Sequence, residues 1–358
     1  MYGNAGVDLY TSWRRTRSVV CTPTGAVVFF SVYVAPAKMS QVAIRRASRS
    51  DCEAIYQLVR ERADARVARI SHSTSIEGLA DLFGSNSTFY FLVAEEKGSL
   101  VGYVLHYYCY SWEGRTICVE DLYVKQNEEW DIVARALWRN LVKIALEEGC
   151  KQFNFPPLRE SEYEFYHHKA KNMTKTNGYR YFRMEEEAME KFVKMNKIPE
   201  GVEVREATSA DCTGINQLIK DLAVHQNVPD KPQIDAKALE DDGFGTKVFY
   251  KCFVAESEGH LIGYTLFFHT FNWRGRGVYM EDLYVAPSYR GKGIGTALWK
   301  QVLKACLAVQ GIRCDFCVLD WNKPSIIFYK GKGAKDMTED SGFTYCVMAK
   351  KIMEDFLQ

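Results

Sequence analysis

A glycine-rich turn with two basic residues is the stretch of this chain best suited to chemistry. It consists of Arg290, Gly291, Lys292, Gly293, Ile294, Gly295 and Thr296. Glycine has no β-carbon, so a ligand can approach the backbone and successive N–H groups can point at a pyrophosphate. The turn lies between an expected strand and an expected helix, whose N-terminus also favours an anion. It therefore predicts a phosphate-binding loop, although a flexible strand-to-helix connection can have the same composition.

Two adjacent carboxylates, Glu281 and Asp282, lie in the expected strand that precedes this turn. Charge in a strand is costly unless it has a role or a partner. Because side chains alternate along a strand, only one of the two can face a given cleft unless a β-bulge intervenes. The pair therefore indicates either a proton-accepting group or a structural anchor of the strand.

The chain contains an internal repeat with an offset of about 160 residues, which is the length of a domain. The matching segments are residues 42–52 with 202–212, and residues 112–124 with 273–285, the latter identical at eight of thirteen positions. We therefore predict a first copy at 39–196 and a second copy at 201–358, joined by the turn-rich segment 196–201.

Both copies have the same order of expected elements. A strand is followed by a helix after Asp51 or Asp211, by paired strands with a hairpin turn, and by the strand with the two carboxylates. A helix, a strand and a final helix–strand unit complete each copy. The order predicts two α/β domains, each with a mixed, mostly antiparallel sheet flanked by helices.

The first copy has lost the glycine-rich turn. Aligned without a gap, its residues Glu129, Trp130, Asp131, Ile132 and Ala134 replace Arg290, Gly291, Lys292, Gly293 and Gly295. Together with Glu128, these acids would repel a pyrophosphate. We therefore predict a degenerate, non-catalytic first domain. Its Glu120-Asp121 pair persists, which keeps the structural interpretation of the carboxylates open.

The composition is that of a soluble globular protein. Of 358 residues, 47% are hydrophobic and 25% charged, and the formal net charge is +1. A balanced charge argues against nucleic acid and favours a small substrate. Eleven cysteines without regular spacing indicate reduced thiols in the cytoplasm. We expect no metal at Cys314 and Cys317, because residues three apart in a strand face opposite sides.

The first 38 residues form a leader that differs in composition from the two copies. They carry three arginines at 14, 15 and 17, an apolar run at 26–35, and Ala35-Pro36-Ala37. This order resembles a targeting peptide, so a mitochondrial or other targeting role remains open. The apolar run is too short to span a membrane. A disordered leader or an alternative start at Met39 explains the segment equally well.

The second copy resembles the spermidine/spermine and thialysine N-ε-acetyltransferase family of the GNAT N-acetyltransferase superfamily over nearly its whole length. The motifs that carry the resemblance are residues 205–212, 218–223, 240–245, 249–250, 279–285, 289–295, 318–322 and 328–330. Residues 273–276 and 319–322 are closer to the thialysine branch. The resemblance implies acetyl-CoA as co-substrate and a primary amine as acceptor, with no metal.

The resemblance also assigns roles in catalysis and in binding acetyl-CoA. Tyr329 is the general acid that protonates the departing thiolate, and Glu281 accepts the proton of the incoming ammonium, through water. The strand after the carboxylates splays from its neighbour and pairs with the pantetheine through Leu283, Tyr284 and Val285. Asn322, Pro324 and Ser325 contact other parts of CoA or only cap the following helix.

For the amine, the resemblance points to eight residues, which are His225, Gln226, Trp273, Glu281, Asp282, Asp315, Phe316 and Cys317. His225 and Gln226 stand where the family has an aromatic residue and a carboxylate, and Phe271 replaces an acid of the spermidine branch. These losses favour a lysine-like amine or a short diamine over spermine, although Asp230 and Asp315 could substitute. His225 could equally be a surface residue of its helix.

The sequence thus predicts a tandem N-acetyltransferase whose second domain transfers acetyl directly to a small amine. The two copies are expected to form an intramolecular pseudo-dimer, with further oligomers possible. Two alternatives remain open: a non-catalytic scaffold or regulator, and an enzyme that acetylates protein lysines.

Overall fold

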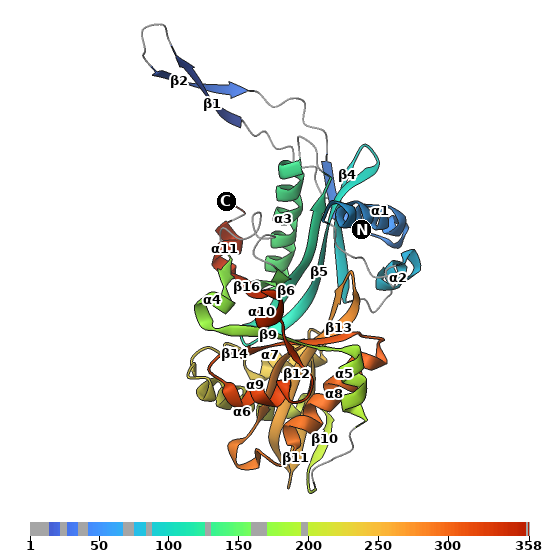
Figure 1. Ribbon diagram of the computed structural model, residues 1–358, viewed down its shortest axis with the longest axis vertical. Helices are drawn as coiled ribbons and strands as arrows, with labels where there is room; N and C mark the ends of the chain where they lie inside the picture. The colour runs from blue at the N-terminus through green and yellow to red at the C-terminus, as the bar shows by residue number, and fades with distance from the viewer. Residues whose placement is uncertain are drawn as a thin grey trace.

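The computed structural model describes residues 14–21, 27–34, 42–66, 75–83, 88–125, 130–158, 170–194, 200–355 and 357. Strands β1 (Arg14–Cys21) and β2 (Val27–Val34) form an antiparallel hairpin within the first 38 residues. The other described strands form two seven-stranded sheets, in the upper and lower halves of the molecule (Figure 1). The leader and the domain boundaries stay predictions. No helix among the described residues is both long and apolar enough to cross a membrane.

The first sheet has the strand order β3-β4-β5-β6-β7-β16-β8. Its strands are β3 (Val42–Arg46), β4 (Phe89–Glu96), β5 (Ser99–Ser111), β6 (Gly114–Val124), β7 (Gln152–Leu158), β16 (Thr344–Ala349) and β8 (Lys171–Asn172). Neighbouring strands are antiparallel except for β6 and β7, which are parallel.

The second sheet has the matching order β10-β11-β12-β13-β14-β9-β15. Its strands are β10 (Glu203–Glu206), β11 (Lys251–Ser257), β12 (His260–Asn272), β13 (Gly275–Val285), β14 (Arg313–Leu319), β9 (Tyr179–Glu185) and β15 (Lys335–Asp336). Here β13 and β14 are the parallel pair. Two mixed, mostly antiparallel sheets confirm the predicted fold class, and the predicted hairpin turns join β5 to β6 and β12 to β13.

The two copies exchange one strand. Strand β9 of the first copy lies between β14 and β15 of the second sheet, and pairs along all of β14 from Arg313 to Leu319. Strand β16 of the second copy lies between β7 and β8 of the first sheet in the same way. Each sheet is therefore completed by the other copy, which confirms the predicted pairing within one chain and makes it a reciprocal strand exchange.

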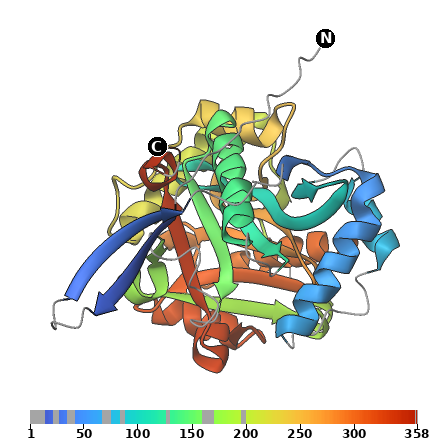
Figure 2. The ribbon, with the colours of Figure 1, turned by 90° about the horizontal axis from the view of Figure 1, so that it is seen from above.

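Helices cover the faces of both sheets. The longer ones are α1 (Cys52–Arg66), α3 (Trp130–Glu147), α5 (Glu186–Val193), α6 (Cys212–His225), α7 (Ala236–Phe244), α8 (Ile294–Ala308) and α9 (Lys323–Lys330). The short ones are α2 (Ile76–Ala80), α4 (Met173–Asn177), α10 (Met337–Ser341) and α11 (Lys350–Asp355). Figures 1 and 2 place α1 and α3 on opposite faces of the first sheet.

The same anchor begins α1 and α6. The Asp211 carboxylate accepts hydrogen bonds from the backbone N–H of Thr208 at 2.7 Å and from the Arg205 guanidinium at 2.8 Å. Asp51 repeats this arrangement with Ser48 and Arg45. The hydrogen bond from Arg205 is the main reason that the pKa of Asp211 falls to about 2. These capped turns explain why both helices begin directly after the repeated aspartate.

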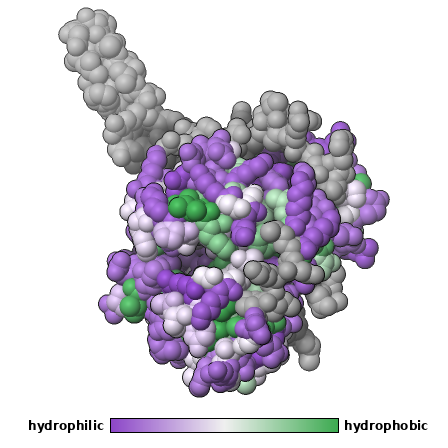
Figure 3. Space-filling model, turned by 60° about the horizontal axis from the view of Figure 1, so that its bottom comes forward, coloured by the Kyte–Doolittle hydropathy of each residue, from purple (hydrophilic) through white to green (hydrophobic). Residues whose placement is uncertain are grey.

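One hydrophobic cluster continues from the first half of the molecule into the second. It joins Leu137 of α3, Ile215 of α6 and Met348 of β16, all fully buried. Across the same junction, the rings of Tyr110 and Tyr250 have centroids 4.7 Å apart. A shared apolar core is typical of obligate association. The face in Figure 3 is largely hydrophilic, with only small hydrophobic patches.

Candidate active site

The second sheet opens between β13 and β14. The parallel pairing covers three positions, and it ends where Met280 lies opposite Phe316. The strands continue to Val285 and Leu319, and a cavity of about 520 Å³ lies at the opening. This divergence agrees with the splay that the resemblance implies. It leaves backbone groups of β13 facing a space in which a ligand can pair with them.

A β-bulge brings both predicted carboxylates to this cavity. In the ladder between β12 and β13, Leu266 pairs with Asp282 and Phe267 pairs with Met280, so Glu281 is an extra residue without a partner on β12. Simple alternation would send Glu281 and Asp282 to opposite faces. The extra residue changes the direction of the strand, and both side chains line the cavity.

Asp282 is a buried carboxylate held by two donors. Its Oδ2 accepts a hydrogen bond from the Trp112 Nε1–H and another from the Tyr264 hydroxyl, both at 2.9 Å. Burial raises the pKa of Asp282, and the two hydrogen bonds oppose the increase. Trp112 belongs to the first copy, so one copy orients an acid of the other.

Glu281 has a pKa well above that of an ordinary glutamate. Burial is the largest cause, the charge of Asp282 raises the pKa further, and the Lys231 ammonium opposes both. A carboxyl group whose pKa is raised in this way holds a proton more readily, which suits proton exchange with a substrate. The structure therefore supports a chemical role for Glu281 beside the structural one.

The cavity is built from both copies. Besides residues of the second copy, it is lined from the first copy by Ser111, Trp112, Glu113, Gln152, Lys171, Met173, Asn177 and Tyr179. The strand exchange brings Tyr179 there, and the tip of the β5–β6 hairpin supplies Trp112 and Glu113. The sequence repeat does not predict that these first-copy residues line the second-copy cavity, because they belong to the copy that lacks the glycine-rich turn.

Lys231 is a second feature that the sequence reasoning missed. Its Nζ lies 3.3 Å from the Tyr179 hydroxyl, and 5.4 Å and 5.8 Å from the ring centroids of Trp112 and Tyr179. Burial lowers its pKa, but Tyr179 and the carboxylates of Glu113 and Glu281 outweigh burial and raise it. The cavity therefore has an arrangement of aromatic faces and acids that stabilises an ammonium group.

Tyr329 lines the cavity from α9. Its ring packs on Phe316 and Trp299, with centroids 4.3 Å and 4.9 Å away. Burial raises its pKa above that of an ordinary tyrosine, so the hydroxyl keeps its proton at neutral pH. The Asn322 side chain accepts from the Ser325 N–H at 3.3 Å and caps this helix. Asn322 and Ser325 also line the cavity, so capping and ligand contact are compatible.

The glycine-rich turn lies at the N-terminus of α8, as predicted. Gly291 and Gly293 have φ angles of 77° and 87°, which only glycine adopts freely. A β-carbon at Gly291 would have open space around it, and Gly293 caps the helix without a side chain. Arg290 is fixed by a 2.9 Å hydrogen bond from Nε to the Val285 carbonyl. The exposed turn therefore presents the first N–H groups of α8 and two cations, which fits a pyrophosphate.

Most of the predicted residues lie at or beside this cavity. Gln226, Glu281, Asp282, Phe316, Cys317 and Tyr329 line it, as do Leu283, Asn322 and Ser325. Tyr284, Val285 and the turn continue from the same strand, and Pro324 lies in the first turn of α9. His225 is exposed at the end of α6 and lies beside Trp321, with ring centroids 6.1 Å apart. It does not line the cavity.

Trp273 and Asp315 lie elsewhere, which corrects their expected place at the second-copy site. Both line a second cavity, beside Glu120 of the first copy. The Trp273 Nε1–H donates to Asp121 at 2.6 Å, just as Trp112 donates to Asp282. Asp315 points to the opposite face of β14 from Phe316, because side chains alternate. The two hairpin tips thus serve each other's cavities.

A splayed pair of strands, a cation-flanked glycine turn at a helix N-terminus and a buried tyrosine define the site of an N-acetyltransferase. Residues 52–168 and 217–334 each match the acetyltransferase (GNAT) family. These matches cover more than half of the chain, which therefore belongs to this family. They also confirm the predicted tandem arrangement.

Several curated proteins are similar to one domain of the chain. The thialysine N-ε-acetyltransferase of Bos taurus is 40% identical over 151 residues, which are 40% of this chain and 89% of that protein. The spermidine/spermine N(1)-acetyltransferase-like protein 1 of Homo sapiens is 34% identical over 149 residues, 39% of this chain and 21% of that protein. These relatives and the family matches identify the chain as an N-acetyltransferase.

Among solved structures, a tandem GNAT protein from the clavulanic acid biosynthesis pathway is similar over 86% of this chain and 98% of its own. Its TM-score is 0.45 and its sequence identity is 12%.

Proposed function

We propose that the second copy transfers an acetyl group from acetyl-CoA directly to the primary amine of a small molecule. The observation that carries the proposal is one cavity that combines Tyr329, Glu281 and the splayed end of β13, a strand that leads to a glycine turn at the N-terminus of α8. Thiol-ester chemistry is supplied by the co-substrate. The residues of the chain bind, orient and move protons.

Glu281 is the group that receives the proton of the incoming ammonium, directly or through water. A protonated amine has no lone pair, so a base must act before the nitrogen can attack. The raised pKa of Glu281 brings it closer to the pKa of an amine. Asp282 is fixed by Trp112 and Tyr264, and stabilises the strand that positions Glu281.

Tyr329 is the proton donor for the departing thiolate. Its hydroxyl keeps its proton because burial raises its pKa, and aromatic packing on Trp299 and Phe316 fixes the ring. Acetyl-CoA is placed by three groups of residues: the turn 290–296, the splayed strand at Leu283, Tyr284 and Val285, and the start of α9 at Asn322, Pro324 and Ser325.

The acids of the cavity favour a short cationic substrate. Glu113, Glu281 and Asp282 line it, and Lys231, whose charge acts on these acids, and Lys171 line it as well. Lys231 would repel the far end of a long polyamine. We therefore propose a lysine-like amine, such as thialysine, or a short diamine. Gln226 and Cys317 are the other polar side chains from the predicted set that can contact it.

The first copy is proposed to be non-catalytic. Trp130 and Asp131 begin α3, where the second copy has Gly291 and Lys292. Asp131 is paired with Arg135 at 3.1 Å. Glu128 and Glu129 lie outside the described residues, as does Tyr166, which matches Tyr329 by local alignment of the two copies. A bulky aromatic residue and an acid at this helix start oppose phosphate binding.

The test is acetyl-CoA turnover by the full chain against thialysine, lysine, short diamines, spermidine, spermine and a lysine-containing peptide. We expect the highest kcat/KM with lysine-like amines or short diamines. A preference for the peptide would favour acetylation of protein lysines, and spermine as the best substrate would contradict the argument from Lys231. Absence of turnover with every amine would favour a scaffold.

A further inference from the structure

The second cavity, beside Glu120, differs in charge from the proposed active site. Its volume is about 220 Å³, and it lies where the first copy would place its own substrate. Its polar lining is dominated by four arginines, which are Arg62, Arg183, Arg274 and Arg313, with the acids Glu120 and Asp315. A degenerate copy could have filled this space with apolar side chains, but it has kept a charged cavity.

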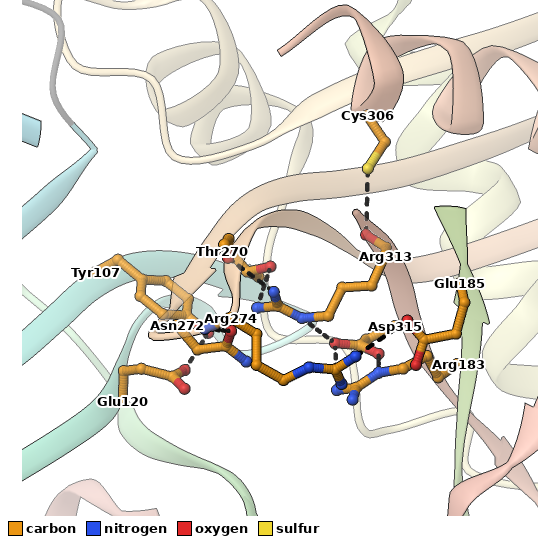
Figure 4. A network of polar contacts seen from close by, with 11 residues as sticks. Tyr107, Glu120, Arg183, Glu185, Thr270, Asn272, Arg274, Cys306, Arg313 and Asp315 are labelled. Atoms are coloured by element: carbon orange, nitrogen blue, oxygen red, sulfur yellow. Dashed lines mark hydrogen bonds and ion pairs between the residues drawn. The ribbon is translucent and has the colours of Figure 1, made fainter. Parts of the chain in front are cut away.

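A buried cluster of charges forms one wall of this cavity (Figure 4). Asp315 accepts from Arg183 at 2.6 Å and 3.1 Å and from Arg313 at 3.0 Å. The side chains of Arg183, Arg313 and Asp315 are only 5%, 2% and 4% exposed. Arg313 also donates to the Gly275 carbonyl at 2.8 Å. Two guanidinium groups therefore share one carboxylate in a place that water hardly reaches.

The acids around this cluster do not neutralise its extra positive charge. Arg62 is paired with Asp121 at 2.8 Å, and Arg274 with Glu185 at 3.4 Å. Glu120 is the remaining acid, and its pKa is raised to about 8, mainly by burial, although Arg313 opposes the increase. The buried cluster of Arg183, Arg313 and Asp315 thus has two guanidinium groups to one carboxylate. An uncompensated buried charge is costly, and an anion would relieve it.

Matched positions of the two copies show that this charge is specific to one cavity. In the proposed active site, Leu222 stands in place of Arg62 and Glu113 in place of Arg274. Gln152 and Val347 likewise stand in place of Arg313 and Arg183, which come from the strands β14 and β9. Every arginine of the second cavity is thus replaced by a neutral or acidic residue in the proposed active site. The same fold presents acids to one ligand and arginines to the other.

We propose that the arginine-lined cavity binds a small carboxylate with an apolar or aromatic body. Guanidinium groups match the planar geometry of a carboxylate, which suits this anion better than a spherical one. The rest of the wall is aromatic, with Tyr107, Phe155, Tyr181, Phe268 and Phe343 among its residues. The volume is smaller than that of most drug-sized sites, so the ligand is about the size of a single-ring acid.

The binding experiment uses phenylacetate as the probe, titrated into the full chain by calorimetry. We expect saturable binding with one site per chain. In Arg183→Val, which copies Val347, affinity should fall by roughly ten- to a hundred-fold, because a hydrogen bond to a charged group is lost. This variant leaves the Arg313–Asp315 pair neutral, so it does not create an unpaired buried charge. Equal affinity in the variant and the natural chain would overturn the proposal.

A second variant tests the same proposal if Arg183→Val does not fold. Arg274→Glu copies Glu113 at the mouth of the cavity, where the arginine side chain is 49% exposed, and should also weaken phenylacetate binding. Arg290→Glu, at the proposed acetyl-CoA turn, should leave it unchanged. Loss of phenylacetate binding in Arg290→Glu but not in Arg274→Glu would place the ligand in the other site and refute the proposal.

The last arm tests the class of ligand. Phenethylamine has the same ring with a cation, and inorganic phosphate has a different anionic shape. Neither should compete with phenylacetate at this cavity. Competition by phosphate at equal or lower concentration would mean that the cavity binds anions in general, which would overturn the proposed preference for a carboxylate. Competition by phenethylamine would contradict the charge argument. If the chain binds phenylacetate as expected but transfers no acetyl group, only the proposed function of the second copy is contradicted.

Discussion

The two cavities of this molecule lie at matched places of the two copies, one beside Glu281-Asp282 and the other beside Glu120-Asp121, yet they differ in charge and size. The one beside Glu281 has about 520 Å³ and carries Glu113 from the opposite hairpin tip. The one beside Glu120 has about 220 Å³ and carries Arg274 at the matched position. The difference teaches that the two copies differ in the charge of their cavities as well as in the glycine-rich turn.

Each cavity depends on the other copy, so the two cannot change independently. Trp112 of the first copy holds Asp282 of the second, and Trp273 of the second copy holds Asp121 of the first. Asp121 is also paired with Arg62, whereas the matched Leu222 leaves Asp282 without an arginine. The first copy therefore completes the sheet and the cavity of the second, which gives a structural reason for its retention.

The largest effect should come from separating the copies. Residues 201–358 alone lack β9, which pairs with the whole of β14, and would expose the shared apolar core. We expect this fragment to lose its cooperative unfolding transition and its activity, or to dimerise. Residues 39–358 are the matched control and should remain folded, monomeric and active. Circular dichroism and light scattering measure both, and a monomeric, active fragment would contradict the need for the exchange.

Next in size is the effect of removing one hydroxyl. Tyr329→Phe should lower kcat by roughly a hundred- to ten-thousand-fold, because a general acid contributes that much to rate. Affinity for acetyl-CoA should change little. Tyr107→Phe in the other cavity is the control, with turnover near normal. A Tyr329→Phe enzyme with normal kcat would assign protonation of the leaving group to water or to another residue.

Charge reversal at the glycine-rich turn should weaken acetyl-CoA binding by at least about tenfold, the value of a lost hydrogen bond to a charged group. The change is Arg290→Glu with Gly293→Ile, which copies Glu129 and Ile132 of the first copy. Gly293 has a φ angle of 87°, so isoleucine there also strains the backbone. Calorimetric titration measures the affinity. Unaltered affinity would place the pyrophosphate elsewhere.

A smaller and more selective effect is expected from the exchanged tryptophans. Trp112→Phe removes a donor from buried Asp282 and should lower kcat/KM by roughly tenfold, since an unsatisfied buried acceptor is costly. Trp273→Phe removes the equivalent donor from Asp121, which keeps Tyr103 and Arg62. It should leave kcat/KM nearly unchanged. The opposite ranking would mean that each tryptophan serves the site of its own copy.

Much of this architecture is readable from the sequence, because local patterns determine it. The repeat predicts two domains, and the alternation of strands and helices predicts mixed sheets. The glycines at 291 and 293 predict a turn at a helix N-terminus, where both have positive φ angles. The bulge is the condition under which adjacent strand residues such as Glu281 and Asp282 reach one cavity, and the structure contains it. These features depend on residues close together along the chain.

The rest depends on contacts between distant residues, which one sequence does not encode locally. The pattern of 179–185 is the same whether β9 pairs within its own copy or with β14. The family resemblance assigns Trp273 to the second-copy site, whereas the pairing of the two copies brings Trp112 there. Lys231 follows a turn with no periodic pattern, so nothing in the sequence signals that it reaches the cavity.

The last prediction compares the matched glutamates by pH dependence. Burial, followed by Asp282, raises the pKa of Glu281, so its basic form appears only as the pH rises through that raised value. The rate of the natural enzyme should rise there. In Glu281→Gln no base is present, and the rate should rise only toward the pKa of a free amine, about 10.4 for a lysine side chain. At such high pH the variant should be within a few-fold of the natural rate.

Glu120→Gln should leave the pH–rate profile in place, because Glu120 lines the other cavity. Profiles of kcat/KM between about pH 6 and 10.5 span both the free enzyme base and the amine, so they decide the matter. If Glu281→Gln keeps the natural profile, Glu281 has the structural role that the persistence of Glu120 suggests.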